Sequence, residues 1–358
     1  MKINFTLFGA GLTGGTFNLA ETAQRLSERG HDVSLTTIGR PADLDWFRKN
    51  RKPLFREIFA SLTGKIWYRI YRRLTRGTIL HPLPETEIRD LIRSMPECDV
   101  NLATAAPTAL AVHRSGQGRG FYYIQHYDSL FGQDPVANRL HDQSYFLPLT
   151  KITVSGWLKN IIQERLGVEI KAVITSGIDE RIFYPRAKAK NNKKRIISLG
   201  RKVAWKGFSD LEAAMRGLFK KRKDFEWLVY SSHDTPESSP AAPFTLVKSP
   251  YGKDLAELYA SSDIVVNPSW HEGFAQPALE GMASGCAVIT TKIGAEDFIE
   301  PNKNCLLVEP ESPDQLEKAL ERLLDDESLR FKLADNGLTK SKEFYWDRII
   351  ESWEKVLK

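Results

Sequence analysis

Short runs of apolar, β-branched and aromatic residues alternate with longer amphipathic runs along most of the chain. In the first half, the short runs predict strands over residues 3–8, 33–37, 100–104, 120–124, 151–154 and 172–175. A longer run at residues 17–29 places Leu19, Ala23 and Leu26 on one side and predicts a helix. Alternation of this kind is typical of α/β domains built on parallel sheets.

The same alternation restarts after a polar, basic run at residues 186–194, which is the best candidate for a linker. Strands are predicted next over residues 195–199, 226–230, 264–267 and 287–290. We therefore expect two Rossmann-like domains, an N-terminal one over 1–183 and a C-terminal one over 184–340. Apolar positions at helical spacing in 341–358 predict a terminal helix, with packing back on the N-terminal domain as a second possibility.

Size and composition restrict the class of protein. A chain of 358 residues with 42% hydrophobic content is long enough for two domains with cores of their own. It contains no run of about 18 apolar residues, and its first residues resemble a strand more than a signal peptide. Three cysteines without the spacing of metal ligands fit a reducing compartment, so a cytoplasmic protein is expected.

Positive charge is concentrated between Trp46 and Arg76. This stretch holds ten lysines and arginines against one acid, Glu57, a net charge of +9 in a chain that carries +6 overall. Aromatic residues among these cations favour a helix that lies on an anionic membrane surface. Because Phe55 and Phe59 are four residues apart, a packed helix pair with a solvated basic face is the alternative. Nucleic acid is not expected as a partner.

Two carboxylates, Glu272 and Glu280, flank a turn that leads into a predicted helix. Pro277 suits the first helical position, where its missing N–H costs nothing. The amides of residues 273–278 are then expected to be free for an anion, which the helix dipole also favours. Since carboxylates beside an anion suit hydroxyl groups, the segment predicts a receptor for a phosphorylated polyol such as a nucleotide sugar.

Two cations follow the strand predicted at residues 195–199. Arg201 and Lys206 are five residues apart, so they can reach one diphosphate from two sides. A diphosphate leaving group gains negative charge as it departs. These cations would therefore stabilise the transition state more than the ground state.

Glycines at positions 9, 11 and 14 follow the first predicted strand with the spacing G-x-G-x-x-G. This spacing is the dinucleotide-binding fingerprint, but the expected acid after the second strand is absent and Arg40 stands there. Because arginine suits a 2′-phosphate, an NADP-dependent oxidoreductase is one alternative. The loop otherwise approaches a diphosphate or an acceptor from the opposite domain, or it is a tight turn without a ligand.

Several motifs together resemble glycosyltransferase family 4, whose members are retaining enzymes with the GT-B fold. The similarity is strong over about 150–310, moderate at the glycine loop and nearly absent over 40–100. The motifs, in chain order, are Gly200-Arg201, Lys206-Gly207, Asp254 to Tyr259, Asp263 to Ser269, and Glu272 to Gly285, with support from Ser155 to Lys159 and Ile174 to Pro185.

The resemblance implies an α/β fold with two Rossmann-like parallel-sheet domains facing a cleft (GT-B). It implies a retaining, metal-independent glycosyltransferase that moves a sugar from a nucleotide-sugar donor to an acceptor hydroxyl. We expect the acceptor to be a glycan or a lipid-linked molecule, in the synthesis of a glycan, a polysaccharide or a glycolipid. We expect the enzyme to be cytoplasmic, and peripheral at the inner face of the membrane if the basic stretch binds lipid. A non-catalytic binding protein of GT-B shape is the second alternative.

The resemblance also implies roles for individual residues. Arg201 and Lys206 would hold the donor diphosphate, Glu272 would accept a hydrogen bond from a sugar hydroxyl, and Glu280 would bind the ribose hydroxyls. Gly14 and Gly15 would close over the diphosphate from the first domain. Backbone and loop groups would complete the donor site, namely Gly273, Phe274, Ala275, Gln276, Ser231, Tyr251 and His271.

His126 follows the fourth predicted strand, at the point where members of the family often carry a histidine near the transferred sugar. We therefore expect it to act with Arg201, Lys206 and Glu272 in catalysis. Asp43 and Asp45 match the D-x-D string of metal-dependent glycosyltransferases of the other fold. They lie beside the second strand, away from the donor domain, so we expect no metal and no other cofactor.

Overall fold

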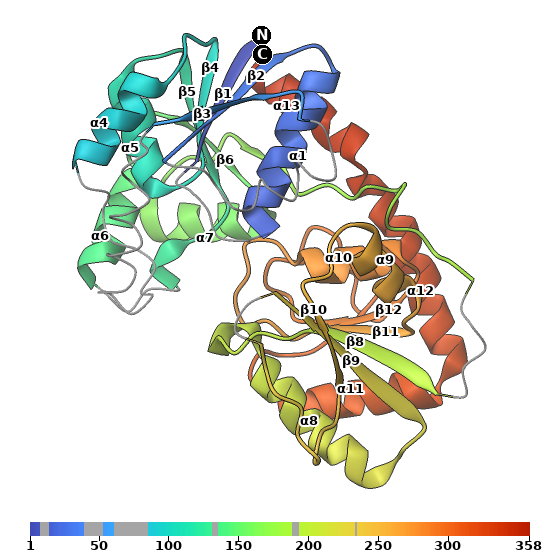
Figure 1. The fold of residues 1–358 in the computed structure, drawn as a ribbon. Helices are drawn as coiled ribbons and strands as arrows, with labels where there is room; N and C mark the ends of the chain where they lie inside the picture. The colour runs from blue at the N-terminus through green and yellow to red at the C-terminus, as the bar shows by residue number, and fades with distance from the viewer. Residues whose placement is uncertain (8–13, 39–52, 61–84, 131–134, 188–192, 233–234) are drawn as a thin grey trace. The chain divides into compact units, whose positions relative to one another are not determined.

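The computed structural model describes the chain except for residues 8–13, 39–52, 61–84, 131–134, 188–192 and 233–234 (Figure 1). The chain forms two compact units, each with one parallel sheet. The first unit comprises Met1–Thr175 and Ile350–Lys358, and the second comprises Ser176–Ile349. Two α/β units with parallel sheets are what the alternation of short and long runs predicts, so the fold class is confirmed.

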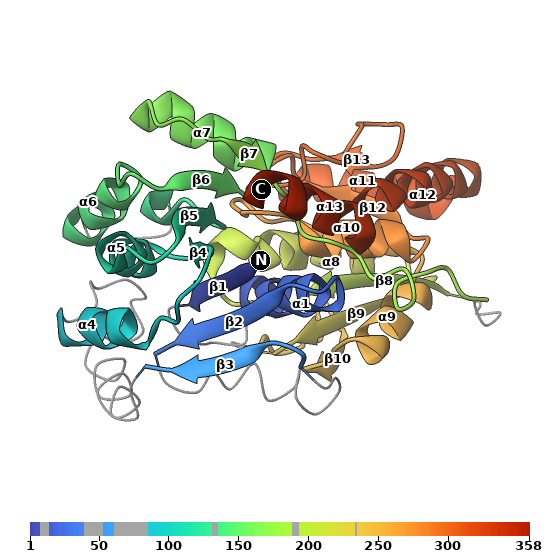
Figure 2. The same cartoon turned by 90° about the horizontal axis from the view of Figure 1, so that it is seen from above.

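Seven parallel strands form the sheet of the first unit, in the order β3-β2-β1-β4-β5-β6-β7 (Figure 2). The order reverses beside β1, because β2 pairs with one edge of β1 and β4 with the other. The strands are β1 (Lys2–Leu7), β2 (Asp32–Thr37), β3 (Arg56–Phe59), β4 (Val100–Ala103), β5 (Arg119–Ile124), β6 (Thr150–Thr153) and β7 (Ala172–Val173).

Helices cover both faces of this sheet (Figure 2). The last helix, α13 (Trp346–Leu357), begins in the second unit and ends in the first. Its Trp353 is buried and makes edge contacts with Phe5 and Tyr123, which anchors the end of the chain in the first core. The other helices in the described part of this unit are α1 (Gly14–Glu28), α4 (Glu85–Ser94), α5 (Ala106–Ser115), α6 (Pro135–Ser144) and α7 (Gly156–Leu166), with a 3₁₀ turn at Asp128–Leu130.

Strand β3 corrects one sequence interpretation. Residues 46–76 are interpreted above as helical, on a membrane or packed, yet Arg56–Phe59 pairs with β2 as the edge of the sheet. Phe55 is buried just before the strand, and Phe59 is exposed. The i, i+4 spacing of these two aromatics therefore does not mark one face of a helix. Most of the basic stretch, with Asp43 and Asp45, lies outside the described residues.

Six parallel strands form the sheet of the second unit, in the order β10-β9-β8-β11-β12-β13. Two short strands, β10 and β13, are not predicted from the sequence. The strands are β8 (Lys194–Leu199), β9 (Phe225–Ser231), β10 (Thr245–Lys248), β11 (Ile264–Asn267), β12 (Ala287–Thr290) and β13 (Leu306–Leu307), so the suggested linker at 186–194 ends inside the first of them.

Apolar side chains from strands and helices form a continuous core in this unit. On one face of the sheet, leucines and aromatics of α8 (Phe208–Lys221) and α11 (Pro313–Asp325) pack against Ile196, Trp227 and Ile264. On the other face, Gly281 lets its helix approach Val265 closely. The helices there are α9 (Lys253–Ala260), α10 (Gln276–Ala283) and α12 (Glu327–Ser341).

The terminal helix predicted for 341–358 begins later than expected, at Trp346. α12 ends at Ser341, a 3₁₀ turn covers Lys342–Phe344, and α13 starts at Trp346. Ile178 is the cause, because its amide donates to the Phe344 carbonyl at 2.8 Å while its carbonyl accepts from the Trp346 amide at 3.2 Å. Backbone groups that a continuous helix needs are therefore used elsewhere. Within the described residues, no helix is both long and apolar enough to cross a membrane.

Candidate functional site

The predicted donor-site residues gather where the strand order of the second unit reverses. β8 pairs with β9 on one side and with β11 on the other, so the loops that leave β8 and β11 are neighbours. Arg201 and Lys206 lie in the first of these loops, and His271 and Glu272 lie in the second. In open α/β sheets, ligands bind at the carboxyl ends of the strands at such a reversal.

Backbone contacts join these two loops. The Trp270 amide donates to the Trp205 carbonyl at 2.7 Å. Gly207 has a left-handed φ of 64°, and a Cβ built on it would lie 2.1 Å from the Pro268 carbonyl oxygen. The Trp270 indole N–H also donates to the Asp210 carboxylate at 2.6 Å. The position of Lys206 is thus set by the loop that carries Glu272.

Lys206 and Glu272 form an ion pair, with 3.1 Å between Nζ and Oε1. Glu272 is buried, whereas the Lys206 side chain keeps about a quarter of its surface open to solvent. Gly294, with φ 75°, makes room for the backbone of Glu272, since a Cβ at position 294 would lie 3.0 Å from the Glu272 carbonyl oxygen. The Lys206 ammonium group therefore lies beside Glu272 and is also open to solvent, from which an anion can approach.

Glu280 lies on α10 beside the buried Tyr259, which in turn contacts Tyr230. Burial raises its pKa to about 7, although hydrogen bonds from Gln276 and Tyr259 act in the opposite direction. The Gln276 amide nitrogen is 3.3 Å from Glu280 Oε1. The hydroxyls of Tyr259 and Tyr230 are 2.6 Å apart, and burial raises the pKa of both phenols. This carboxyl group is thus poised to change protonation near neutral pH.

Tyr230 and Tyr259 are partners of the site that the residue-by-residue assignment misses. Tyr259 belongs to the quoted motif from Asp254 to Tyr259, which is the signal that was available for it. Tyr230 sits at the end of β9 without any local motif. Tyr259 is a hydrogen-bond partner of Glu280, and Tyr230 contacts Tyr259.

The start of α10 corrects one expectation about anion binding. The Ala275 amide donates to the Gly294 carbonyl at 2.8 Å, and the Gln276 amide donates to the Phe274 carbonyl at 2.9 Å. These two amides are used inside the protein and are not free for a phosphate, because the turn before the helix is tight. For the amides of Gly273 and Phe274, no protein acceptor is found within the described part of the chain. These two remain open to a ligand.

The remaining loop residues of the second unit lie at the same edge of the sheet. Ser231 ends β9 and is buried, and its carbonyl accepts from the Ser249 amide at 2.8 Å. Tyr251 precedes α9 and is half-buried, as is His271 beside Glu272. All three follow the carboxyl ends of strands, where a ligand at the reversal point would lie.

Three predicted residues belong to the first unit. Gly14 begins α1, and Gly15 lies so close to Gln125 that a Cβ there would be 2.7 Å from its side-chain oxygen. His126 follows β5, is exposed, and accepts a hydrogen bond at its carbonyl from the Tyr145 hydroxyl at 3.2 Å. The start of α1 and the loop that carries His126 are therefore adjacent. Glycines 9 and 11 lie outside the described residues.

Comparison with known proteins finds sequence similarity to glycosyltransferases. The model of the family described as Glycosyl transferases group 1 matches residues 193–326, which include the β8 and β11 loops. An uncharacterized glycosyltransferase of Haemophilus influenzae is 24% identical over 375 aligned residues, covering 99% of each chain. This relative extends the similarity over both units.

Solved structures share the fold over nearly the whole chain. Sucrose-phosphate synthase from Thermosynechococcus elongatus superposes with a TM-score of 0.78 at 16% identity, covering 99% of this chain and 98% of that one. HepE from Anabaena, solved in complex with UDP-glucose, gives a TM-score of 0.78 at 15% identity, covering 100% and 99%. At such identities the likeness shows the fold, which is GT-B. Together with the family match over residues 193–326 and the full-length relative, it identifies the chain as a glycosyltransferase.

Proposed function

We propose that this chain is a retaining, metal-independent glycosyltransferase of family 4 that uses a nucleotide-sugar donor. The observation that carries the proposal is the ion pair of Lys206 with Glu272 at the reversal point of the second sheet. A cation for phosphate beside a carboxylate for hydroxyl groups matches the two halves of such a donor. The UDP-glucose complex of HepE, which has the same fold, supports this class of ligand.

Each half of the donor has a partner in this arrangement. Lys206 donates to the diphosphate while it keeps its contact with Glu272, and Arg201, in the same loop, reaches the diphosphate from a second side. Glu272 accepts a hydrogen bond from a sugar hydroxyl. Glu280, held by Gln276 and Tyr259, accepts the ribose hydroxyls. The backbone amides of Gly273 and Phe274 donate to the sugar or the phosphate, whereas the amides of Ala275 and Gln276 are used inside the protein.

The proposed chemistry is a displacement on one face of the sugar. The bond between the anomeric carbon and the donor phosphate oxygen breaks, and the acceptor oxygen bonds to that carbon from the same side. The departing phosphate oxygen takes the proton of the acceptor hydroxyl, so no protein base is required. Arg201 and Lys206 stabilise the charge that develops on the diphosphate, a contribution that is larger in the transition state than before it.

The acceptor belongs, in this proposal, to the first unit. His126 and the glycine loop at Gly14 and Gly15 follow carboxyl ends of strands on the two sides of that sheet's reversal point. A glycan or a lipid-linked acceptor fits the family, in glycan, polysaccharide or glycolipid synthesis. Contact of residues 46–76 with an anionic membrane, as a peripheral protein at its cytoplasmic face, is part of the same proposal.

Thermal unfolding tests the choice between this function and the NADP-dependent oxidoreductase. A nucleoside diphosphate should raise the midpoint of unfolding, because a ligand that binds only the folded state stabilises it. NADPH at the same concentration should leave the midpoint unchanged. The reverse pattern would contradict the proposal. A nucleotide sugar that binds without any transfer to acceptors would favour a non-catalytic binding protein.

Donor affinity should depend on pH through Glu280. With a pKa of about 7, the carboxyl group is mostly ionised at pH 8 and mostly protonated at pH 6. Since the ionised form accepts the ribose hydroxyls better, donor affinity should fall about tenfold as the pH drops from 8 to 6. Glu280→Gln should bind more weakly at pH 8 and lose this dependence. Calorimetric titration at both pH values measures it, and equal slopes for the two proteins would contradict the role of Glu280.

The same pKa predicts an effect on stability. Because folding raises the pKa of Glu280 above the ordinary value of 4.5, this residue contributes stability below pH 4.5 that is lost as the pH rises through about 7. Without donor, Glu280→Gln should therefore gain in unfolding midpoint relative to the wild type as the pH rises from 6 to 8. This control separates the titration of Glu280 from any titration of the ligand.

Transfer should persist when divalent cations are removed. In this proposal the charge of the diphosphate is met by Arg201 and Lys206, and a metal ion has no step to perform. Activity in excess EDTA should equal that in buffer alone, measured as nucleoside diphosphate released from the donor. Loss of activity that Mg²⁺ restores would contradict the metal-independent mechanism.

A further inference from the structure

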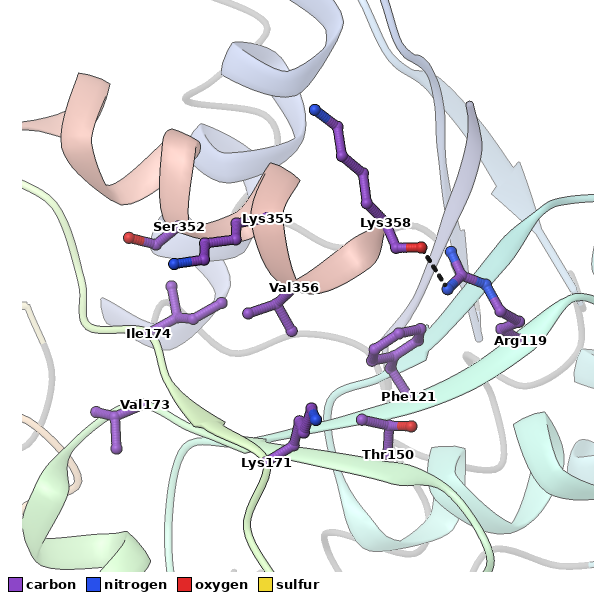
Figure 3. A pocket seen from close by; sticks show the side chains of 10 residues that line it. All are labelled: Arg119, Phe121, Thr150, Lys171, Val173, Ile174, Ser352, Lys355, Val356 and Lys358. Atoms are coloured by element: carbon purple, nitrogen blue, oxygen red, sulfur yellow. Dashed lines mark hydrogen bonds between the residues drawn. The ribbon is translucent and has the colours of Figure 1, made fainter.

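A hollow of about 570 Å³ lies in the first unit (Figure 3). Its strand side is formed by Arg119 and Thr150, which begin β5 and β6, and by Lys171, just before β7. These positions are at the amino ends of the strands, whereas His126 follows a carboxyl end. The other side is the last part of α13. The volume is within the range of small-molecule sites.

The charged side chains that line the hollow are all cations, and Arg119 bonds the main-chain oxygens of Leu357 and Lys358 at its edge. Besides Arg119 and Lys171, its lining includes Lys355 and Lys358 but no aspartate or glutamate side chain. The partly buried acid of this part of α13, Glu354, is directed elsewhere, since its oxygens lie 3.2 Å from Arg29 and 3.1 Å from His31. A concave surface with one sign of charge attracts ions of the other sign.

The four cations are not equivalent. Arg119 donates to the carbonyls of Leu357 and Lys358, the latter at 3.0 Å, and so it closes the carboxyl end of α13. The Lys358 side chain extends away from the other lining groups in Figure 3. Lys171 and Lys355 are exposed, and neither takes part in an ion pair or a side-chain hydrogen bond within the described residues. These two ammonium groups are available to a ligand.

Apolar side chains lie among these cations. Phe121 and Ile174 are buried, and Val173 and Val356 are half-buried. Figure 3 shows Val356 facing the hollow from α13 and Ile174 from the strand side. A small inorganic anion would leave this surface in water. An anion with an apolar part would cover it and gain the free energy of burial.

We propose that this hollow binds an amphipathic phosphate, with the phosphate held by Lys171 and Lys355 and the apolar part against Ile174 and Val356. Thr150, which lines the same hollow, adds a hydroxyl group on the strand side. A phosphate monoester suits this set better than a carboxylate, because it carries close to two negative charges and three acceptor oxygens. The proposal does not depend on the proposed glycosyl transfer.

Such a ligand would connect α13 to the strands of the first unit. Lys355, Ser352 and Val356 come from α13, and Lys171, Thr150 and Ile174 come from the strand side. α13 is the segment through which the chain returns from the second unit to the first. Binding should therefore slow amide hydrogen exchange in residues 350–357, a change that adsorption elsewhere on the surface would not produce.

Titration with a short-chain phosphatidic acid, which is monomeric in water, tests the proposal on the full chain. Lys171→Glu and Lys355→Glu should each weaken binding about tenfold or more, the range expected for a lost hydrogen bond to a charged group. Arg93→Glu is the matched control, since it changes the charge of the same unit equally on α4, which lies far from α13 in both views. Inorganic phosphate should bind at least about tenfold more weakly than the lipid.

Vesicles distinguish the two sources of such a phosphate. The protein is sedimented with phosphatidylcholine vesicles that contain phosphatidic acid and with vesicles that lack it. Sedimentation that requires phosphatidic acid, and that the Lys171→Glu variant loses, would assign the ligand to a membrane. Binding of the monomeric lipid alone would assign it to a free amphiphile. The proposal is overturned if neither lipid form binds, if inorganic phosphate binds as tightly, if Arg93→Glu weakens binding equally, or if residues 350–357 exchange at an unchanged rate.

Discussion

Lys206→Ala is expected to lower turnover about 100- to 1000-fold, the usual cost of removing one group that stabilises developing charge. Lys206 is the cation that the structure holds at 3.1 Å from Glu272, in a loop tied to the β11 loop by the bond from Trp270 to Trp205. Its charge would meet the diphosphate as the sugar departs. Turnover should therefore fall far more than donor affinity. Steady-state kinetics that separate kcat from KM provide the measurement.

Lys202→Ala is the matched control for this result, because Lys202 belongs to the same loop but is exposed. It should keep nearly full turnover. Lys206→Ala also leaves the buried Glu272 without its cation, so its unfolding midpoint must be compared with that of the wild type. The double variant Lys206→Ala with Glu272→Gln removes both charges. Near-wild-type turnover by a folded Lys206→Ala protein would refute the assigned role.

Gly207→Ala should destabilise the second unit by about 3 kcal/mol, equivalent to roughly 6–12 °C in unfolding midpoint. Two costs add at this position. The residue has a left-handed φ of 64°, and its Cβ would lie 2.1 Å from the Pro268 carbonyl oxygen. Relief of that collision would move the β8 loop away from the β11 loop. Donor binding should therefore fall together with stability.

Gly167→Ala separates these two costs. Gly167 has a nearly identical φ of 65°, but no atom lies within 4 Å of its would-be Cβ. This variant should lose only the stability that the left-handed backbone conformation costs a residue with a Cβ, about 1 kcal/mol, and it should bind the donor normally. Calorimetric unfolding of both variants gives the comparison. Equal losses would show that the close approach to Pro268 contributes nothing.

Hydrophobic patterning was sufficient to predict most of the sheet. Central strands such as Ile264–Asn267 and Ala287–Thr290 are short apolar runs, buried on both faces, and their prediction is confirmed. The missed strands β3, β10 and β13 have two to four residues each. β3 and β10 are also edge strands, with half-buried and exposed residues only. Such segments pair because a neighbouring strand is present, and local sequence does not encode that neighbour.

The candidate site was predictable as far as its motifs extend. The motifs placed Arg201 and Lys206 in a loop after a strand, and the two glutamates on either side of a turn that leads into a helix. They did not indicate that Lys206 contacts Glu272, because 66 residues separate them and the contact depends on the pairing of β8 with β11. The use of the Ala275 amide by Gly294 was missed for the same reason. Contacts between distant loops follow from topology.

The central claim is that the loops after β8 and β11 bind a nucleotide sugar. Calorimetric titration of the wild type with a panel of nucleotide sugars tests it directly, with Glu272→Gln, Glu280→Gln and Lys202→Ala titrated in parallel. The account predicts that a nucleotide sugar binds, that each glutamate variant weakens its binding about tenfold or more, and that Lys202→Ala does not. Absence of binding by every nucleotide sugar, or binding by both glutamate variants as tight as that of the wild type, would contradict it.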